Sequence, residues 1–510
     1  MLRALYGNMR TMVVWRGLAV VGLAWATGSE SQPAIPKTNA YRVEEERLGA
    51  FHERDDARRL VVWSPKFSED GCHVAYEVHE GDRRFVVVDG QPGPAYRYIK
   101  EIVFSPDGKR VAYAAETGLG KWVLIVDGRP ATEECEDVDL GYTFSVDGRR
   151  LAYPARKGSK RFVVVDGQSG PGYDYVWGIV FSRDAQRVAY GAQKDGKNFV
   201  VVDGQPSPGY EDIVLPFLSP DGKRIAYWGR KGRQRVILKD DKWLVVPADE
   251  GDGVRVVVDG QEGPPYDAVR HIVFSPDSKR LAYSAEKSGQ WFLVVDGQRG
   301  SPFEAIPWTC IAFSPDSKRI AYAAKTGDKW LTVLDGQPGP QYDHIMDFVF
   351  AQDGKRYAYA GKKGDQWFAV IDAQPGPGYS EVRSPTFSPD GKHSAYAAAR
   401  GKVQRIGFHG TGTGVYAGEG TRMFMVFDGR EGPEYGLVER PMFSPDGKHF
   451  VFKASKGRKW FVVLDDAPCP EYDAILDKGP CFRSNGVLEY LAVKQKSLYR
   501  VKHLPVSEGK

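Results

Sequence analysis

A ten-residue pattern recurs along nearly the whole chain of 510 residues, and it limits the possible folds more than any other feature. At residues 104–113 it reads Phe-Ser-Pro-Asp-Gly-Lys-Arg-Val-Ala-Tyr. The leading aromatic returns every 37 to 40 residues, with two longer intervals of 56 residues, at Phe67, Phe104, Phe144, Phe181, Leu218 (a substitution), Phe274, Phe313, Phe350, Phe387, Phe443 and a degenerate copy at Phe482. A unit this short cannot bury a core alone, so neighbouring units must stack.

Each unit predicts four short antiparallel strands. Ser-Pro-Asp-Gly suits a tight turn because Pro fixes φ and Gly closes the turn without a Cβ clash, so 102–104 and 111–115 are the expected first and second strands. Residues 121–126 supply a third strand, and Asp127-Gly128 suits a two-residue hairpin. The segment that follows is rich in Gly and Pro, which restricts it to the sheet edge.

The third strand indicates how the units pack. It is apolar at consecutive positions, as at 162–165, so both faces of its sheet must be covered. A composition of 58 Gly and 33 Pro beside 42% hydrophobic residues fits many short strands with tight turns. The predicted fold class is all-β, a β-propeller of about 10–11 four-stranded antiparallel blades.

The repeat resembles the TolB-type WD40-like propeller repeat over roughly residues 57–500, and it is similar to repeats in the propellers of prolyl-oligopeptidase-like enzymes. The resemblance implies the fold. It implies little about function, because propellers host many activities.

The number of units leaves the architecture open between one large ring and two tandem propellers divided near 265–273. The repeats span 57–505, and the last unit supplies only three strands. An early extended segment, either 41–47 within the N-terminal stretch 27–56 or 57–62, is expected to complete it.

The two 56-residue intervals each contain about 19 extra residues between the second and third strands. These insertions, at 229–254 and 400–423, predict extended hairpins that project from one face.

Residues 1–26 predict a secretory signal peptide, because three arginines and no acid precede a short apolar stretch that ends in Ala24-Trp25-Ala26. An uncleaved anchor is the alternative, although about 20 apolar residues are needed to span a bilayer. We therefore expect a secreted or periplasmic protein with no stable membrane insertion after cleavage. The net charge of +4 offers no basic stripe, which argues against a nucleic-acid partner.

Five cysteines in a chain of this length do not form a disulfide framework. Cys72, Cys135 and Cys310 are far apart and are expected to be small buried apolar residues. Cys469 and Cys481 are close enough in sequence for a disulfide between them to remain an open alternative.

Catalytic and metal-binding signatures are missing from the sequence. It contains no Gly-x-Ser-x-Gly, His-Glu-x-x-His or Cys-x-x-Cys motif. The acidic segments 137–141 and 249–253 lack the full spacing of a calcium loop and are interpreted as solvated turns. We expect no catalytic residue, no metal and no cofactor.

Tyrosine recurs at the last position of the pattern, as at Tyr113, Tyr190 and Tyr283. Recurrence in nearly every unit predicts packing between blades rather than a ligand-stacking surface.

The pattern stops repeating three residues before the leading aromatic, where a propeller would begin its innermost strand at the mouth of the central channel. Glu101, His271, Asp347 and Arg440 stand at this position in four units. They predict a mixed-charge binding ring on the face that bears the hairpins, with relaxed sequence in a solvated loop as the alternative.

Two hypotheses for function follow. The first is an exported, non-catalytic scaffold that binds another protein or a cell-envelope component through the channel mouth and the hairpin residues Trp243, His409 and Tyr416. The second is a small-ligand or glycan binder, or a hydrolase, in which His271 and an acid such as Asp347 or Glu101 act as acid and base.

Overall fold

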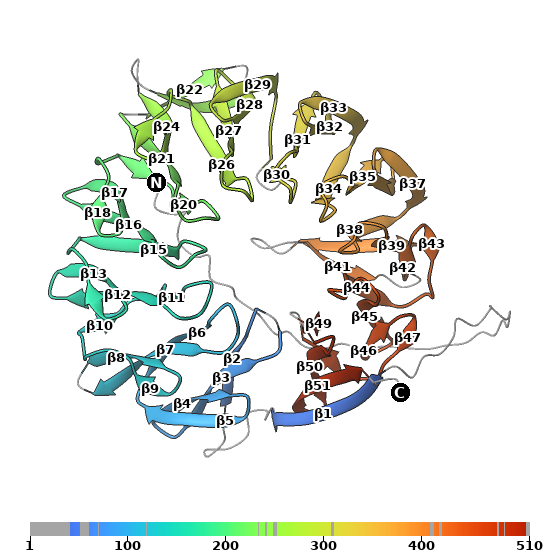
Figure 1. The fold of residues 1–510 in the computed structure, drawn as a ribbon, viewed down its shortest axis with the longest axis horizontal. Helices are drawn as coiled ribbons and strands as arrows, with labels where there is room; N and C mark the ends of the chain where they lie inside the picture. The colour runs from blue at the N-terminus through green and yellow to red at the C-terminus, as the bar shows by residue number, and fades with distance from the viewer. Residues whose placement is uncertain are drawn as a thin grey trace.

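The computed structural model describes residues 41–50, 61–69, 71–118, 120–232, 234–239, 242–247, 252–307, 311–407, 413–417, 421–476, 479–483 and 485–505. Within these ranges the chain is all-β, and eleven antiparallel sheets follow one another around a single ring (Figure 1). The predicted fold class is confirmed, and the blades form one ring rather than two propellers.

In each blade the first strand lies nearest the centre of the ring and the fourth lies outermost (Figure 1). Blades 1 to 4 comprise β2 (Val61–Phe67), β3 (Val74–Glu80), β4 (Arg83–Val88) and β5 (Gln91–Tyr96); β6 (Ile99–Phe104), β7 (Val111–Gly118), β8 (Lys121–Val126) and β9 (Arg129–Pro130); β10 (Asp137–Val138) with β11 (Thr143–Phe144), β12 (Leu151–Lys157), β13 (Lys160–Val165) and β14 (Gln168–Ser169); β15 (Tyr175–Phe181), β16 (Val188–Lys194), β17 (Lys197–Val202) and β18 (Gln205–Pro206).

Blades 5 to 8 comprise β19 (Asp212–Ile213) with β20 (Phe217–Leu218), β21 (Ile225–Lys231), β24 (Gly253–Val258) and β25 (Gln261–Glu262); β26 (Ala268–Phe274), β27 (Leu281–Lys287), β28 (Gln290–Val295) and β29 (Gln298–Phe303); β30 (Ala312–Phe313), β31 (Ile320–Thr326), β32 (Lys329–Leu334) and β33 (Gln337–Tyr342); β34 (His344–Phe350), β35 (Tyr357–Lys363), β36 (Gln366–Ile371) and β37 (Gln374–Tyr379).

Blades 9 to 11 comprise β38 (Glu381–Phe387), β39 (Ser394–Arg400), β42 (Arg422–Phe427) and β43 (Arg430–Glu431); β44 (Leu437–Phe443), β45 (Phe450–Lys456), β46 (Lys459–Leu464) and β47 (Ala467–Pro468); β48 (Ala474–Ile475) with β49 (Cys481–Phe482), β50 (Leu488–Lys494), β51 (Ser497–Pro505) and β1 (Tyr41–Ala50).

The recurring turn is built from local polar contacts. The hydroxyl of Ser105 donates to Asp107 Oδ1 over 2.6 Å and accepts the backbone N–H of Arg110 over 2.9 Å, which fixes the turn between β6 and β7. Arg110 Nε donates to Asp127 Oδ2 over 2.9 Å, so this turn is tied to the third strand of its own blade. Arg110 Nη1 also donates to the carbonyl of Gly148 in blade 3 over 3.0 Å. The regular spacing of the pattern therefore places Arg110 where it bonds both within its own blade and to the next blade.

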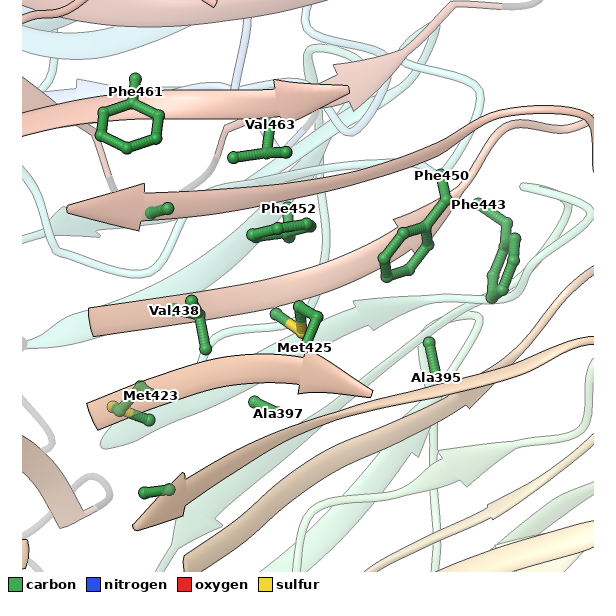
Figure 2. Packing of buried hydrophobic residues seen from close by; sticks show 12 residues of the cluster. Ala395, Ala397, Met423, Met425, Val438, Phe443, Phe450, Phe452, Phe461 and Val463 are labelled. Atoms are coloured by element: carbon green, nitrogen blue, oxygen red, sulfur yellow. The ribbon is translucent and has the colours of Figure 1, made fainter. Parts of the chain in front are cut away.

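The core consists of apolar layers between adjacent blades. Figure 2 shows one of them, in which Met425 of blade 9 faces Phe452 of blade 10 and Met423 lies below Val438. Alanines such as Ala395 and Ala397 let the sheets approach closely.

The recurring tyrosines are buried and meet edge-to-face across the blade boundaries. Tyr96 of blade 1 and Tyr113 of blade 2 have ring centroids 6.4 Å apart, and Tyr266 and Tyr283 repeat the arrangement at 6.1 Å. This confirms the packing role that recurrence predicted, since edge-to-face pairs are a favoured aromatic geometry.

The ring is closed by an N-terminal strand. β1 pairs antiparallel with β51, from Tyr41 opposite Pro505 to Ala50 opposite Ser497, and becomes the outermost strand of blade 11. Of the two segments considered from the sequence, 41–47 lies in β1, whereas Val61 and Val62 begin β2 of blade 1.

The insertions form two extra hairpins, β22 (Gln234–Lys239) with β23 (Lys242–Pro247) and β40 (Val403–Gly407) with β41 (Thr413–Ala417). Each lies between the second and third strands of its blade. Residues 1–40, which include the expected signal peptide, lie outside the described residues. Within the described part of the chain, no helix has the length and apolar character needed to cross a membrane.

Candidate functional site

The positions singled out in the first strands coincide with β-bulges. The pairing of the first and second strands shifts between Lys100 and Ile102 in blade 2, and equivalent shifts include His271 in blade 6 and Asp347 in blade 8. Glu101, His271 and Asp347 have φ values of 22°, 48° and 57°, which lie in the left-handed region.

The expected placement at the start of the innermost strand is corrected. The strands begin two or three residues earlier, at Ile99, Ala268 and His344, so the bulges lie within them. The sequence pattern could not show this, because the bulge adds one residue without interrupting the strand.

Two of the predicted binding carboxylates connect neighbouring blades. Glu101 Oε2 accepts the backbone N–H of Gly141 in blade 3 over 2.9 Å. Asp347 Oδ2 accepts the backbone N–H of Ser384 in blade 9 over 3.0 Å. Each carboxylate thus satisfies an N–H of the next blade that is left outside the sheet pairing, by the gap between β10 and β11 in blade 3 and by the bulge of β38 in blade 9.

His271 is half-buried beside Arg270, whose guanidinium carbon lies 4.4 Å from the centroid of the Trp291 ring. Burial first, and then the positive charge of Arg270, lower the pKa of the His271 imidazole below its usual value. Both effects favour the neutral form of the imidazole. Blade 7 stands between His271 in blade 6 and Asp347 in blade 8, so the fold does not bring these two together as a direct acid–base pair.

The other predicted residues are placed only by their strands. Arg440 lies in β44, Trp243 in β23 and Tyr416 in β41, and the positions of their side chains lie outside the described part of the structure. His409 lies outside the described residues altogether.

An exposed apolar surface, which sequence reasoning missed, lies at the first strands of consecutive blades. Among the described residues seven large apolar side chains are exposed, and six of them lie in or beside the first strands of blades 2 to 5. Tyr98, Leu140, Tyr175, Leu215 and Phe217 precede the turn to the second strand, whereas Val146 lies in that turn. This concentration on less than half of the ring distinguishes the surface from scattered exposure. We call Leu140, Tyr175, Leu215 and Phe217 the inner-strand patch.

Two contacts hold patch residues of blades 4 and 5 in place. Leu215 of blade 5 packs over Gly178 of blade 4, where a Cβ atom would not fit. Tyr175 stacks on Trp177 with ring centroids 5.9 Å apart and planes 24° apart. These contacts hold the patch on the sheet edges rather than on long loops.

A charged pair borders the patch at blade 3. The Arg161 guanidinium carbon lies 5.2 Å from the centroid of the Tyr175 ring, and Arg161 Nε donates to Asp139 Oδ2 over 2.8 Å. Asp139 directly precedes Leu140 in the chain. The site therefore offers exposed aromatic and aliphatic surface with a fixed arginine beside it.

One sequence signal could have indicated this surface. Phe217 precedes Leu218, whereas other units place a smaller residue before the aromatic, as at Val103, Thr143 and Val273. At this position Phe217 therefore carries a large aromatic ring where those units carry a small side chain. Leu140 gives no such signal, because its exposure arises where the first strand of blade 3 is interrupted between β10 and β11.

The described residues contain no group of three or more His, Cys, Asp or Glu side chains arranged to hold a metal ion. The acidic segment 249–253 lies partly outside these residues.

Comparison with known proteins identifies propellers and no family. No family model and no curated protein matches the sequence. TolB from Acinetobacter baumannii is 14% identical over 55% of this chain and 80% of that chain, with a TM-score of 0.24. The propeller domain of the Trilobed protease from Pyrococcus furiosus is 13% identical over 63% of this chain and 96% of that domain, with a TM-score of 0.27.

The tricorn protease is 13% identical over 89% of this chain and 58% of that chain, with a TM-score of 0.28. These likenesses concern the propeller architecture, and at such identities they carry no activity to this chain.

Proposed function

We propose that this chain is an exported, non-catalytic scaffold that binds a protein partner of the cell envelope through the inner-strand patch. The observation that carries the proposal is the concentration of exposed apolar side chains on blades 3 to 5. Tyr, Trp and Arg are the residues that most often dominate protein–protein binding energy, and Tyr175, Trp177 and Arg161 lie together at this site.

The patch suits a protein partner better than a small ligand. It extends across the edges of three sheets, whereas small-molecule sites are concave and bury most of the ligand surface. The hairpins β22–β23 and β40–β41 would enlarge this contact surface. Each hairpin follows the end of a second strand, and the end of a second strand lies beside the start of the first strand because the two strands are antiparallel.

A capture experiment tests the proposal. The double variant Tyr175→Ser, Leu215→Ser, immobilised beside the wild-type chain, should capture at least about tenfold less of the partner from an envelope extract, because two anchors are lost. Val146→Ser is the matched control, since Val146 is 48% exposed but lies in the turn between β11 and β12, at the opposite end of the blade. Equal capture by the double variant and the wild type, with unchanged melting temperatures, would contradict the proposal.

Two further variants separate the alternatives. Replacing both inserted hairpins by short turns should reduce capture if they contribute to the contact surface. The triple variant Glu101→Gln, His271→Asn, Asp347→Asn should leave capture intact. If it abolishes a hydrolytic turnover or a glycan-induced rise in melting temperature, the ligand-binding or hydrolytic alternative is favoured instead.

A further inference from the structure

Two cysteines from opposite ends of the chain meet where the ring closes. Cys72 Sγ of blade 1 lies 2.9 Å from Cys481 Sγ of blade 11, although the two residues are 409 positions apart in sequence. Cys469, the partner considered for Cys481 from the sequence, instead has its sulfur 3.8 Å from His503 Nδ1. The structure therefore places the Cys481 sulfur against Cys72 across the seam, not against Cys469, the alternative that the sequence left open.

Both cysteines depart from the repeat. Cys72 stands where other units carry a basic residue such as Lys109, whose side chain is 79% exposed, yet Cys72 is completely buried. Cys481 stands directly before the leading aromatic, a position that is Val103 in blade 2. The departures occur in the first and last blades, which only the closed ring brings together.

The backbone around Cys72 is held by blade 11. Arg500 Nε of β51 donates to the Cys72 carbonyl over 3.1 Å, and Arg500 Nη2 pairs with Asp89 Oδ1 of blade 1 over 2.8 Å. Arg500 Nε also lies 3.2 Å from Oε1 of Glu489, which is the register partner of Cys481 in the sheet. One buried arginine thus orders both cysteine-bearing segments.

We propose that Cys72 and Cys481 form a disulfide that locks the inner side of the ring seam under oxidising conditions. The sulfurs need to approach by less than about 1 Å to reach the S–S length of about 2.05 Å. β1 closes the outer side of the same blade through β51, so the disulfide supplies a second and covalent closure nearer the centre.

The chemistry requires a disulfide oxidant, for which we name oxidised glutathione. Cys481 is the more accessible of the two, so its thiolate attacks one glutathione sulfur and releases the first reduced glutathione. The Cys72 thiolate then attacks the sulfur of Cys481 and releases the second. Two protein thiols and one glutathione disulfide thus become one protein disulfide and two glutathione thiols.

The test uses the full chain equilibrated with oxidised or reduced glutathione. Peptide mapping without reductant should recover the Cys72 and Cys481 peptides as one linked species, lighter than the two thiol peptides by two hydrogen atoms. The unfolding half-time in denaturant should lengthen on oxidation by on the order of tenfold or more, because the linkage encloses most of the chain.

Matched variants make the result decisive. Cys481→Ser and Cys72→Ser should abolish both the linked peptide and the effect of oxidation on unfolding, whereas Cys469→Ser should retain both. Recovery of a Cys469–Cys481 peptide would overturn the proposal. Free thiols at Cys72 and Cys481 after equilibration with oxidised glutathione would also overturn it.

Discussion

At the scale of single residues, the repeated pattern is explained by contacts within one turn and by contacts between neighbouring blades. The bonds from Ser105 to Asp107 and Arg110 lie within one turn, so the sequence sufficed to predict that turn. The reach of Arg110 to Gly148 depends on how blades 2 and 3 stand beside each other. No spacing in the sequence expresses that angle, so the sequence does not predict the contact between Arg110 and blade 3.

Asp347 tests whether a bulge residue is structural or part of the binding surface. Asp347→Ala removes the acceptor for the Ser384 N–H and leaves an alanine at a φ of 57°, so we expect a loss of about 1 to 2 kcal/mol of stability. Asp347→Asn keeps an acceptor oxygen and tolerates this φ, so its melting temperature should stay near the wild-type value.

Thermal unfolding and partner capture, measured on both variants, check this assignment. A structural Asp347 requires that Asp347→Ala melts earlier while the folded variant still captures the partner. If capture is lost at an unchanged melting temperature, Asp347 belongs to the binding surface.

At the scale of strands, predictability differed with position in the blade. Second and third strands such as β7 and β8 follow from their apolar runs and tight turns, and both were expected close to their actual bounds. First strands were less predictable, because β10 and β11 are interrupted around Leu140 and others carry bulges. The inner-strand patch arises at these irregular strands, which is the physical reason why the sequence gives no sign of it apart from the large ring of Phe217.

The closing strand β51 carries a buried histidine that makes blade 11 sensitive to acid. His503 Nε2 lies 3.1 Å from the Tyr490 hydroxyl oxygen, and burial lowers the pKa of the imidazole to about 4. In the unfolded chain the pKa is about 6.5, so the unfolded state binds more protons between these values. The contribution of neutral His503 is therefore complete above about pH 6.5 and is lost as the pH falls towards 4, by at most about 3 kcal/mol.

Melting temperatures between pH 7 and pH 4.5 measure this effect. The wild type should lose more stability over the interval than His503→Gln, which has no imidazole to protonate. His344→Gln changes an exposed histidine in β34 and should follow the wild-type curve. Parallel curves for the wild type and His503→Gln would exclude His503 as a source of the acid sensitivity.

At the scale of the whole molecule, counting the repeats predicted the number of blades but not their arrangement. One ring of eleven blades requires a particular wedge angle at each boundary, which is set by packing such as that of Ala395 and Ala397 against blade 10 (Figure 2). The closure is likewise a property of the complete ring. It joins β1 to β51 and places Arg500, Glu46 and Asp89 in one ion-pair group.

Removal of β1 tests how far the ring depends on this closure. Deleting residues 1–50 exposes the backbone edge of β51, and it removes the Glu46 carboxylate 3.0 Å from Arg500 Nη1 and the Glu45 acceptor 2.7 Å from the Tyr472 hydroxyl. We expect this variant to melt earlier and to self-associate, because an unpaired edge strand is a template for another chain. Deleting only residues 1–40 retains β1 and should preserve the melting temperature and oligomeric state of the full chain. Light scattering coupled to size-exclusion chromatography distinguishes the two outcomes, and equal mass and melting behaviour for both deletions would show that β1 does not hold the ring closed.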